Sequence, residues 1–120
     1  MKAVFRELIV WQKAMDLVEE VYRLSKKLPQ DESYGLVNQL RRAVVSIPSN
    51  IAEGNARHSQ KEYAHFLSIA RGSKSEVETQ LEICVRLSYL DAAQIQVAMG
   101  LCDEVGKMIS ALIRRMSSSP

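Results

Sequence analysis

The residues with the most obvious capacity for chemistry are two histidines and the glutamate beside one of them. Glu62 and His65 have the Glu-x-x-His spacing that di-iron helical bundles use. Such a site requires a second copy of the motif, and the 120-residue sequence contains none. His58 and His65 lie seven residues apart and can share a helix face, but two imidazoles do not complete a zinc site. The sequence therefore predicts no metal and no other cofactor.

The sequence offers no convincing nucleophile either. Cys84 and Cys102 are too few for a disulfide framework. Both fall on apolar faces of predicted helices, which favours buried, reduced thiols in a cytoplasmic protein. The stretch RGSKSE, residues 71–76, lacks the glycine spacing and the preceding strand of a phosphate-binding loop. Because no nucleophile, base and pocket combine, we expect a protein that is not an enzyme.

The distribution of basic residues is more informative. Between Ser33 and Lys61 there are four cations and one acid, Glu53, so this segment has a local charge of +3 in a chain of net charge +2. Neither Arg41 nor Arg42 has an acidic residue three or four positions away. Arginine and lysine side chains commonly contact nucleic-acid phosphates. The predicted nucleic-acid-binding residues are Arg41, Arg42, Arg57 and Lys61.

Plain structural roles compete with this interpretation. One outward strip of the same predicted helix contains Asn38, Arg42 and Ser49. It suits phosphate contacts, but it can also be ordinary solvated surface. Arg41 sits at the boundary of the core and can pair with a glutamate of a neighbouring helix or subunit. A second basic pair, Arg114 and Arg115, ends the last predicted helix, where cations favour the helix dipole.

The apolar spacing predicts four long helices that position these residues. Spacings of three, four and seven predict a first helix over residues 8–28, ended by Pro29. A capping box that begins at Ser59 starts a third helix, which we expect to end near Leu90. Asp91 caps a fourth helix, whose apolar residues alternate spacings of three and four as a heptad seam.

The second predicted helix contains the stretch SIPSNIAEG. An interior proline such as Pro48 loses one backbone hydrogen bond and clashes with the preceding turn, at a cost of ~3 kcal/mol. Either the helix bends and continues, which exposes Ser46 and Ser49, or it stops and restarts with Asn50 as its cap. We expect the bend, because the apolar stripe keeps its phase through the proline. Gly54 then provides a natural helix end.

Together these patterns predict an all-α fold, an antiparallel up-down-up-down four-helix bundle with a proline-kinked second helix. One domain covers residues 1–116, and SSSP at 117–120 is expected to be a disordered tail. No apolar run is long enough to span a membrane, and the charged N-terminal stretch does not resemble a secretory signal. We therefore expect a cytoplasmic protein with no membrane partner.

Several apolar residues lie off the main stripes of the helices. A bundle of this size needs only one inward face per helix, so the surplus predicts a second buried surface and self-association. These residues are Val10, Met15, Val45, Ala52, Ile69, Ile83, Val97 and Met108.

Residues 8–90 resemble the four-helix bundle family encoded by intervening sequences in bacterial 23S rRNA genes. The most specific matching elements are Trp11, YGL at 34–36, QLRRAVVSIPSNIAEG at 39–54, KEY at 61–63 and GSKSEVETQL at 72–81. The resemblance implies bacterial cytoplasmic proteins that form ring-shaped homopentamers. It extends to the accessory variability determinants of diversity-generating retroelements, which engage a reverse transcriptase and its template RNA through a basic barrel.

For this chain the resemblance implies a non-enzymatic, RNA-associated oligomeric scaffold, with structured RNA and a reverse transcriptase as partners. Arg41 and Arg42 match the LRR of the family, and Arg57 and Lys61 match its basic positions after AEG. The alternative is a protein-only interaction module with no nucleic-acid role.

Overall fold

The structure, a computed structural model that describes residues 4–117, is built from helices and contains no strand in that range. The elements in chain order are the 3-10 helix η1 Phe5–Glu7, α1 Ile9–Ser25, the 3-10 helix η2 Gln30–Glu32, α2 Leu36–Asn55, α3 Gln60–Arg86 and α4 Gln96–Ser117. The predicted all-α fold with four long helices is confirmed for this part of the chain.

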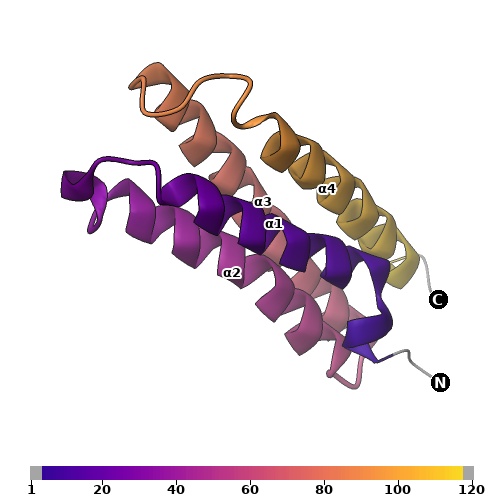
Figure 1. Cartoon of the computed structure of the whole chain (residues 1–120). Coiled ribbons are helices and arrows are strands. Elements are labelled where there is room, and N and C mark those ends of the chain that lie inside the picture. Colours follow the sequence, from indigo (N-terminus) through magenta and orange to yellow (C-terminus); the bar gives the residue numbers. More distant parts are fainter. Residues whose placement is uncertain (1–3, 118–120) are drawn as a thin grey trace.

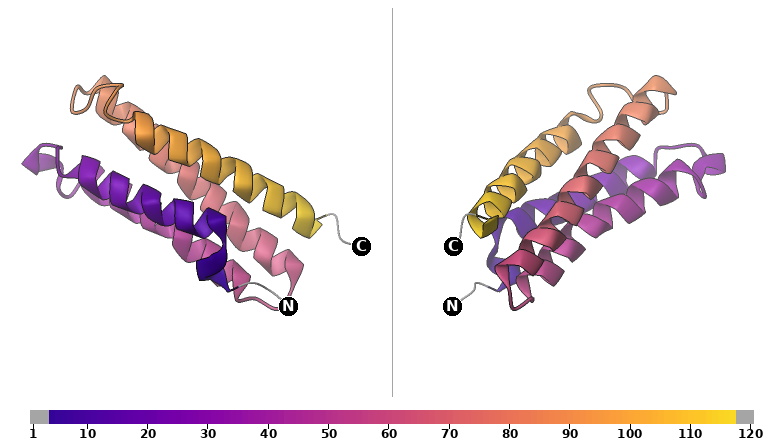
Figure 2. Two further views of the ribbon diagram at one scale, coloured as in Figure 1. Left: turned by 45° about the vertical axis from the view of Figure 1, so that its right-hand side comes forward. Right: turned by 180° about the vertical axis from the view of Figure 1, so that it is seen from behind.

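The four long helices pack so that each contacts two others. α1 lies against α2 and α4, and α3 lies against the same two helices. The assembly measures 49 × 23 × 20 Å along its principal axes. In Figures 1 and 2, α1 begins and α4 ends at the same end of the elongated molecule, where the turn between α2 and α3 also lies. The connections 26–35 and 87–95 lie at the opposite end.

The core is formed by one apolar face of each of the four long helices. Its largest fully buried side chains are Leu17, Val21 and Leu24 of α1, Leu40, Val44, Ile47 and Ile51 of α2, Leu67, Val77 and Leu81 of α3, and Val105 and Ile109 of α4. Each contributes about 1.5–3 kcal/mol through removal of its surface from water. The core thereby fixes the rotation of each helix, and so decides which polar residues reach the surface.

Four helix boundaries differ from their predicted positions. α1 ends at Ser25, and residues 26–28 form turns rather than helix. α3 ends at Arg86 because Ser88 adopts a left-handed φ of 63°, which is incompatible with a continuing helix. The Oδ1 atom of Asp91 accepts a hydrogen bond from the Gln94 N–H at 2.8 Å, but this caps a turn that precedes α4. At its other end α4 reaches one residue into the predicted tail, and 118–120 lie outside the described residues.

Other local signals act as expected. Ser59 caps α3, since its Oγ accepts a hydrogen bond from the Glu62 N–H at 3.1 Å. At the far end of the bundle, Glu32 joins the two connections. Its carboxylate accepts hydrogen bonds from the Tyr89 hydroxyl at 2.8 Å and the Leu36 N–H at 3.3 Å. A Cβ at Gly35 would lie 2.6 Å from that carboxylate, so the glycine gives it room to reach the start of α2.

α2 continues through Pro48 as one helix, so the stop-and-restart alternative is wrong. Asn50 is not a cap, because its side-chain amide donates hydrogen bonds to the Ser46 carbonyl at 2.8 Å and to the Ser46 Oγ at 2.9 Å. The Oγ atoms of Ser46 and Ser73 are also hydrogen-bonded at 2.8 Å. The expected exposure of Ser46 is therefore wrong, whereas Ser49 is exposed.

Gly54 allows α2 and α3 to approach each other closely. It is the next-to-last residue of α2 and does not adopt the left-handed conformation of a typical helix end. A Cβ at this position would lie 2.9 Å from the Phe66 Cβ and 3.2 Å from the Tyr63 carbonyl oxygen. Gly72 is different, since a Cβ there would meet no atom within 4 Å. Gly72 therefore makes no close contact with a neighbouring helix, and its neighbour Ser73 makes the contact with α2 instead.

The two helical glycines should respond oppositely to alanine. Gly54→Ala should destabilise the fold by about 1–3 kcal/mol, because α3 must move to accept the methyl group. Gly72→Ala should stabilise it by up to about 1 kcal/mol through helix propensity alone. Urea denaturation of both variants and the wild type at one protein concentration checks this. Equal stability of the wild type and Gly54→Ala would contradict the close approach.

Candidate functional site

Arg41, the first of the predicted RNA contacts, holds α1 and α2 together. Its Nε donates a hydrogen bond to the Ser25 Oγ at 2.9 Å, and its guanidinium carbon lies 4.5 Å from the ring centroid of Tyr22. The Ser25 hydroxyl in turn donates to the Tyr22 carbonyl at 2.8 Å. The partner on the neighbouring helix is thus a hydroxyl and an aromatic ring rather than a glutamate. This half-buried guanidinium has a structural role within one chain.

Arg42, the next residue, is exposed and has no ion-pair partner within residues 4–117. It lines a polar groove of about 310 Å³ between α2 and α3, which we call the α2–α3 groove. The other residues of this groove are Asn38, Gln39, Ala43 and Ser46 of α2 and Ser73, Glu76 and Gln80 of α3. The predicted strip is therefore divided, because Asn38 and Arg42 face this groove while Ser49 faces α1.

Arg57 and Lys61 lie at the other end of α2. Arg57 forms an ion pair with Glu53 at 2.9 Å, and its guanidinium carbon lies 4.8 Å from the centroid of the Phe66 ring. Lys61 is exposed in the first turn of α3. Arg42 and Arg57 are 15 positions apart, which is about 22 Å along a helix at roughly 1.5 Å per residue. One chain therefore does not bring the four predicted residues into a single patch.

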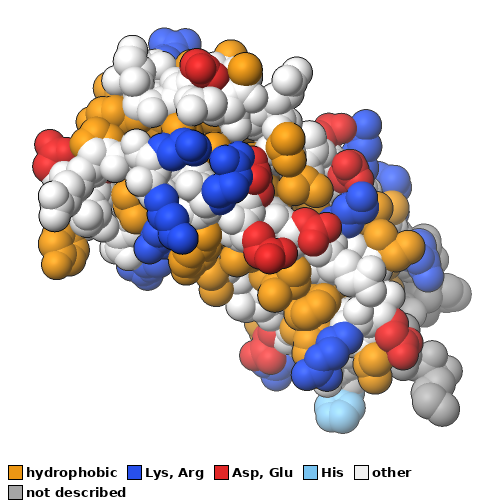
Figure 3. Space-filling model, in the orientation of Figure 1, with side chains coloured by type: hydrophobic (Ala, Val, Ile, Leu, Met, Phe, Trp, Pro, Cys, Tyr) orange, Lys and Arg blue, Asp and Glu red, His pale blue; other side chains and the backbone are white. Residues whose placement is uncertain are grey.

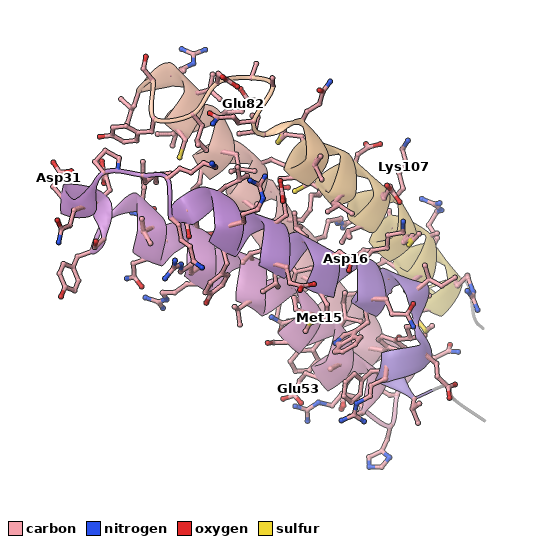
Figure 4. The ribbon with its side chains drawn as sticks, viewed as in Figure 1. Met15, Asp16, Asp31, Glu53, Glu82 and Lys107 are labelled. Carbon is pink, nitrogen blue, oxygen red and sulfur yellow. The ribbon has the colours of Figure 1, made fainter. Side chains whose placement is uncertain are left out.

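The structure reveals a basic groove that the sequence pattern alone does not indicate. It has a volume of about 290 Å³ and lies between α3 and α4. Its lining consists of Arg71 and Lys74 from α3 and of Asp103, Gly106, Lys107, Ser110 and Arg114 from α4. Figure 4 shows Lys107 on the side of α4 that points away from α1. The spacing of Lys107, Ser110 and Arg114 along one helix face was the available signal, but only the packing of α3 adds Arg71 and Lys74 to it.

Part of the charge in this basic groove is already neutralised. Lys74 pairs with Glu78 at 3.0 Å, and Lys107 pairs with Asp103 at 3.0 Å. Arg71 donates a weaker hydrogen bond to the Ser110 Oγ at 3.3 Å. Arg71 is therefore the groove cation on α3 that lacks a carboxylate partner within residues 4–117.

An apolar groove of about 360 Å³, which we call the α1–α2 groove, lies between the first two helices. It is formed by Trp11, Met15 and Val18 of α1 and by Val45, Pro48, Ser49 and Ala52 of α2. Met15 and Val45 are 38 % and 40 % exposed, so apolar surface from both helices is open to solvent in this groove. Figure 3 shows hydrophobic side chains at the surface on this side of the molecule, and Figure 4 shows Met15 on the exposed face of α1.

The remaining surplus apolar residues are divided between core and surface. Val10 is buried and belongs to the core, so its assignment to a second surface is wrong for the single chain. Met108 is half-buried against the core. Ile69, Ile83 and Val97 are exposed on α3 and α4, away from the α1–α2 groove.

The cysteines and histidines do not form a reactive centre. Cys84 and Cys102 are both buried and free, and burial raises the pKa of Cys102 to about 12, so its thiol stays protonated near neutral pH. His65 is exposed, with its ring 5.5 Å from that of Phe66 in an edge-to-face arrangement. Within residues 4–117 no cluster of three or more histidine, cysteine, aspartate or glutamate side chains could hold a metal ion. None of the helices described is long and apolar enough to cross a bilayer.

Comparison with known families places these surfaces in context. The 23S rRNA-intervening sequence protein family matches residues 6–111, which include all the predicted RNA contacts and most of α4. The chain belongs to this family. No curated protein matches its sequence.

A solved structure has the same fold as this family member. It is a protein with unknown function from the S23 ribosomal protein family of Bacteroides thetaiotaomicron, with a TM-score of 0.81 and 24% sequence identity. The similarity covers 88% of this chain and 98% of that one. At this level of identity the comparison establishes the fold alone.

The adjacent arginines should have different effects on stability. Arg41→Gln should cost about 1–2 kcal/mol, because it removes a charge-assisted hydrogen bond and a cation–π contact between α1 and α2. Arg42→Gln should change the free energy of unfolding by no more than about 0.5 kcal/mol, as expected for an exposed side chain. Chemical denaturation of the two variants measures this difference, and equal losses would mean that the Arg41 contacts contribute nothing.

Proposed function

We propose that this protein is a non-enzymatic oligomeric scaffold that associates with structured RNA. In this proposal the chain forms an antiparallel up-down-up-down bundle with a bend at Pro48, and copies assemble through the α1–α2 groove. The observation that carries the proposal is the apolar lining of that groove, in which Met15 and Val45 are more than one-third exposed. Exposed apolar patches rimmed by polar residues typically mark interaction sites.

The predicted bend acquires a specific role in this proposal. Pro48 lines the α1–α2 groove, between Val45 and Ala52 on the same face of α2. A bend there would set how far α2 diverges from α1 and hence the width of the groove. We therefore include Pro48 in the proposed subunit contact. The resemblance to ring-shaped relatives makes five copies the expected assembly.

RNA is the proposed partner for two reasons. Arg42 and Lys61 are exposed cations without ion-pair partners in the described chain. The family is also named after an intervening sequence of 23S rRNA, and the solved relative belongs to a family named after a ribosomal protein. Because the cations of one chain are far apart, a continuous basic surface would require several copies. This links the RNA-binding part of the proposal to the assembly part.

The resemblance to accessory variability determinants makes a reverse transcriptase the proposed protein partner. A specific observation also favours the alternative, a protein-only interaction module. Arg41 and Arg57 already make contacts within the chain, and this leaves fewer cations for phosphate than the sequence suggested. The two functions share the scaffold and differ in whether RNA binds.

Self-association is tested by placing a charge in the α1–α2 groove. Val45→Glu should lower the particle mass seen by analytical ultracentrifugation, because a buried carboxylate without a partner is strongly unfavourable. Val97→Glu, an exposed change of the same kind on α4, should leave the mass unchanged. A monomeric wild-type protein would overturn the assembly proposal, and a monomer caused only by Val97→Glu would move the contact to α4.

RNA association is tested by the salt dependence of binding to a labelled RNA hairpin. We expect the wild-type affinity to fall steeply with salt, and Arg42→Gln/Lys61→Gln to reduce the log–log slope by about 2, or about one unit per lost phosphate contact. Arg71→Gln/Arg114→Gln removes the same charge from the α3–α4 face and serves as the matched control.

Three results of this salt series lead to different conclusions. A slope reduced only by the Arg42/Lys61 variant assigns the contact to α2 and the first turn of α3. A slope reduced only by the control variant transfers the contact to the basic groove between α3 and α4. Absence of wild-type binding at low salt would leave the protein-only module.

A further inference from the structure

The basic groove between α3 and α4 contains two kinds of cation. Its two lysines, Lys74 and Lys107, are each neutralised by a carboxylate at 3.0 Å. Its two arginines, Arg71 and Arg114, are exposed and have no carboxylate partner within residues 4–117. The positive charge that this groove can offer to a ligand therefore belongs to the two guanidinium groups.

The two arginines lie at the same end of the groove, beside Ser110. Arg71 donates a hydrogen bond from its Nη1 to the Ser110 Oγ at 3.3 Å, and this bond links α3 to α4. Arg114 follows Ser110 by four positions on α4, so both side chains lie on one helix face. The Ser110 Oγ is the acceptor in the bond from Arg71, and its own hydrogen can be directed at a ligand. Two guanidinium groups and one hydroxyl donor are thus gathered at this end.

The opposite end of the groove is polar but has no excess charge. A Cβ at Gly106 would lie 2.9 Å from the Lys74 Cε and 3.2 Å from its Nζ, so the glycine lets this lysine lie across α4. Glu78 holds the same lysine, and Asp103 holds Lys107 one turn further along α4. The groove therefore has a charged end and a neutral end.

The charged end matches a dianionic phosphate. A phosphate monoester carries a charge of about −1.5 to −2 near neutral pH, together with three strong acceptor oxygens. A guanidinium group can bind two such oxygens through parallel N–H donors, so Arg71 and Arg114 supply direction as well as charge. A backbone phosphodiester carries a single charge and would leave one guanidinium without compensation. The groove volume of about 290 Å³ is close to the lower end of the range for small-molecule sites.

We propose that the end of the basic groove formed by Arg71, Ser110 and Arg114 binds the dianionic phosphate group of a small molecule. The remainder of that molecule lies toward the neutral end of the groove. This inference goes beyond the proposed RNA association and does not rest on it, because that association uses Arg42 and Lys61.

The test compares four small molecules by isothermal titration calorimetry with the full chain. Adenosine monophosphate should bind about tenfold more tightly than cyclic adenosine monophosphate, because the cyclic diester lacks the second charge. Adenosine, which has no phosphate, should not bind. Inorganic phosphate distinguishes the source of the group. If its affinity equals that of adenosine monophosphate, the site recognises phosphate alone, and a weaker affinity means that the nucleoside adds contacts.

Single substitutions assign the binding to the proposed end of the groove. Arg71→Gln and Arg114→Gln should each weaken the binding of adenosine monophosphate about tenfold, the low end for a lost hydrogen bond to a charged group. Arg86→Gln removes an exposed arginine elsewhere on α3 and should leave the affinity unchanged. In thermal unfolding, saturating adenosine monophosphate should raise the Tm of the wild type, and at the same concentration it should raise that of Arg71→Gln less.

The other outcomes separate failure of this inference from failure of the proposed function. Equal affinity for the monoester and the cyclic diester overturns the phosphate site, and so does binding that survives both glutamine substitutions. No binding of adenosine monophosphate or inorganic phosphate to the folded wild type also overturns it. The hairpin salt series is a separate readout, so a loss of RNA binding overturns the proposed function and leaves this site in place.

Discussion

The close approach of α2 to α3 is the constraint on which the rest of the molecular surface depends. At one point it is set by Gly54, where any side chain would meet Phe66 and the backbone of Tyr63. Two turns earlier in α2, the hydroxyl pair of Ser46 and Ser73 joins the same helices. Contacts at these two points oppose rotation and sliding of α2 against α3. The residues on its other faces are therefore held in fixed positions toward α1 and toward solvent.

A helix held in this way presents different chemistry on its two flanks. Successive residues are rotated by about 100° around a helix axis, so adjacent side chains point in different directions. Val45 and Pro48 face α1 and form an apolar groove, whereas Arg42 and Ser46 face α3 and form a polar one. The proposed assembly contact thus uses one flank of α2, while polar residues occupy the other.

Features set by neighbouring residues in the chain were predictable, whereas features set by distant residues were not. The cap formed by Ser59 and the continuation of α2 through Pro48 follow from local spacing, and both are present. The partner of Arg41 is Ser25, 16 positions away, and no pattern within α2 indicates it. The sequence around Gly54 indicates only a helix end. The atoms that require a glycine there lie on α3, so the sequence of α2 alone does not indicate the close contact. The residues that α3 contributes to the grooves could not be predicted either, because a groove between two helices exists only after the helices have packed.

The contrast between Arg41 and Arg42 shows how a basic motif can be divided between structure and function. Sequence alone treats the pair as one site, yet Arg41 contacts Tyr22 and Ser25 while Arg42 remains exposed beside Gln80. The contacts of Arg41 hold α1 against α2, and this keeps Arg42 at the rim of the α2–α3 groove. Loss of Arg41 would therefore weaken ligand binding indirectly, through the position of α2, even if its own guanidinium never touches a phosphate. A double substitution at both positions merges these two effects, and only single substitutions assign them to the correct side chain.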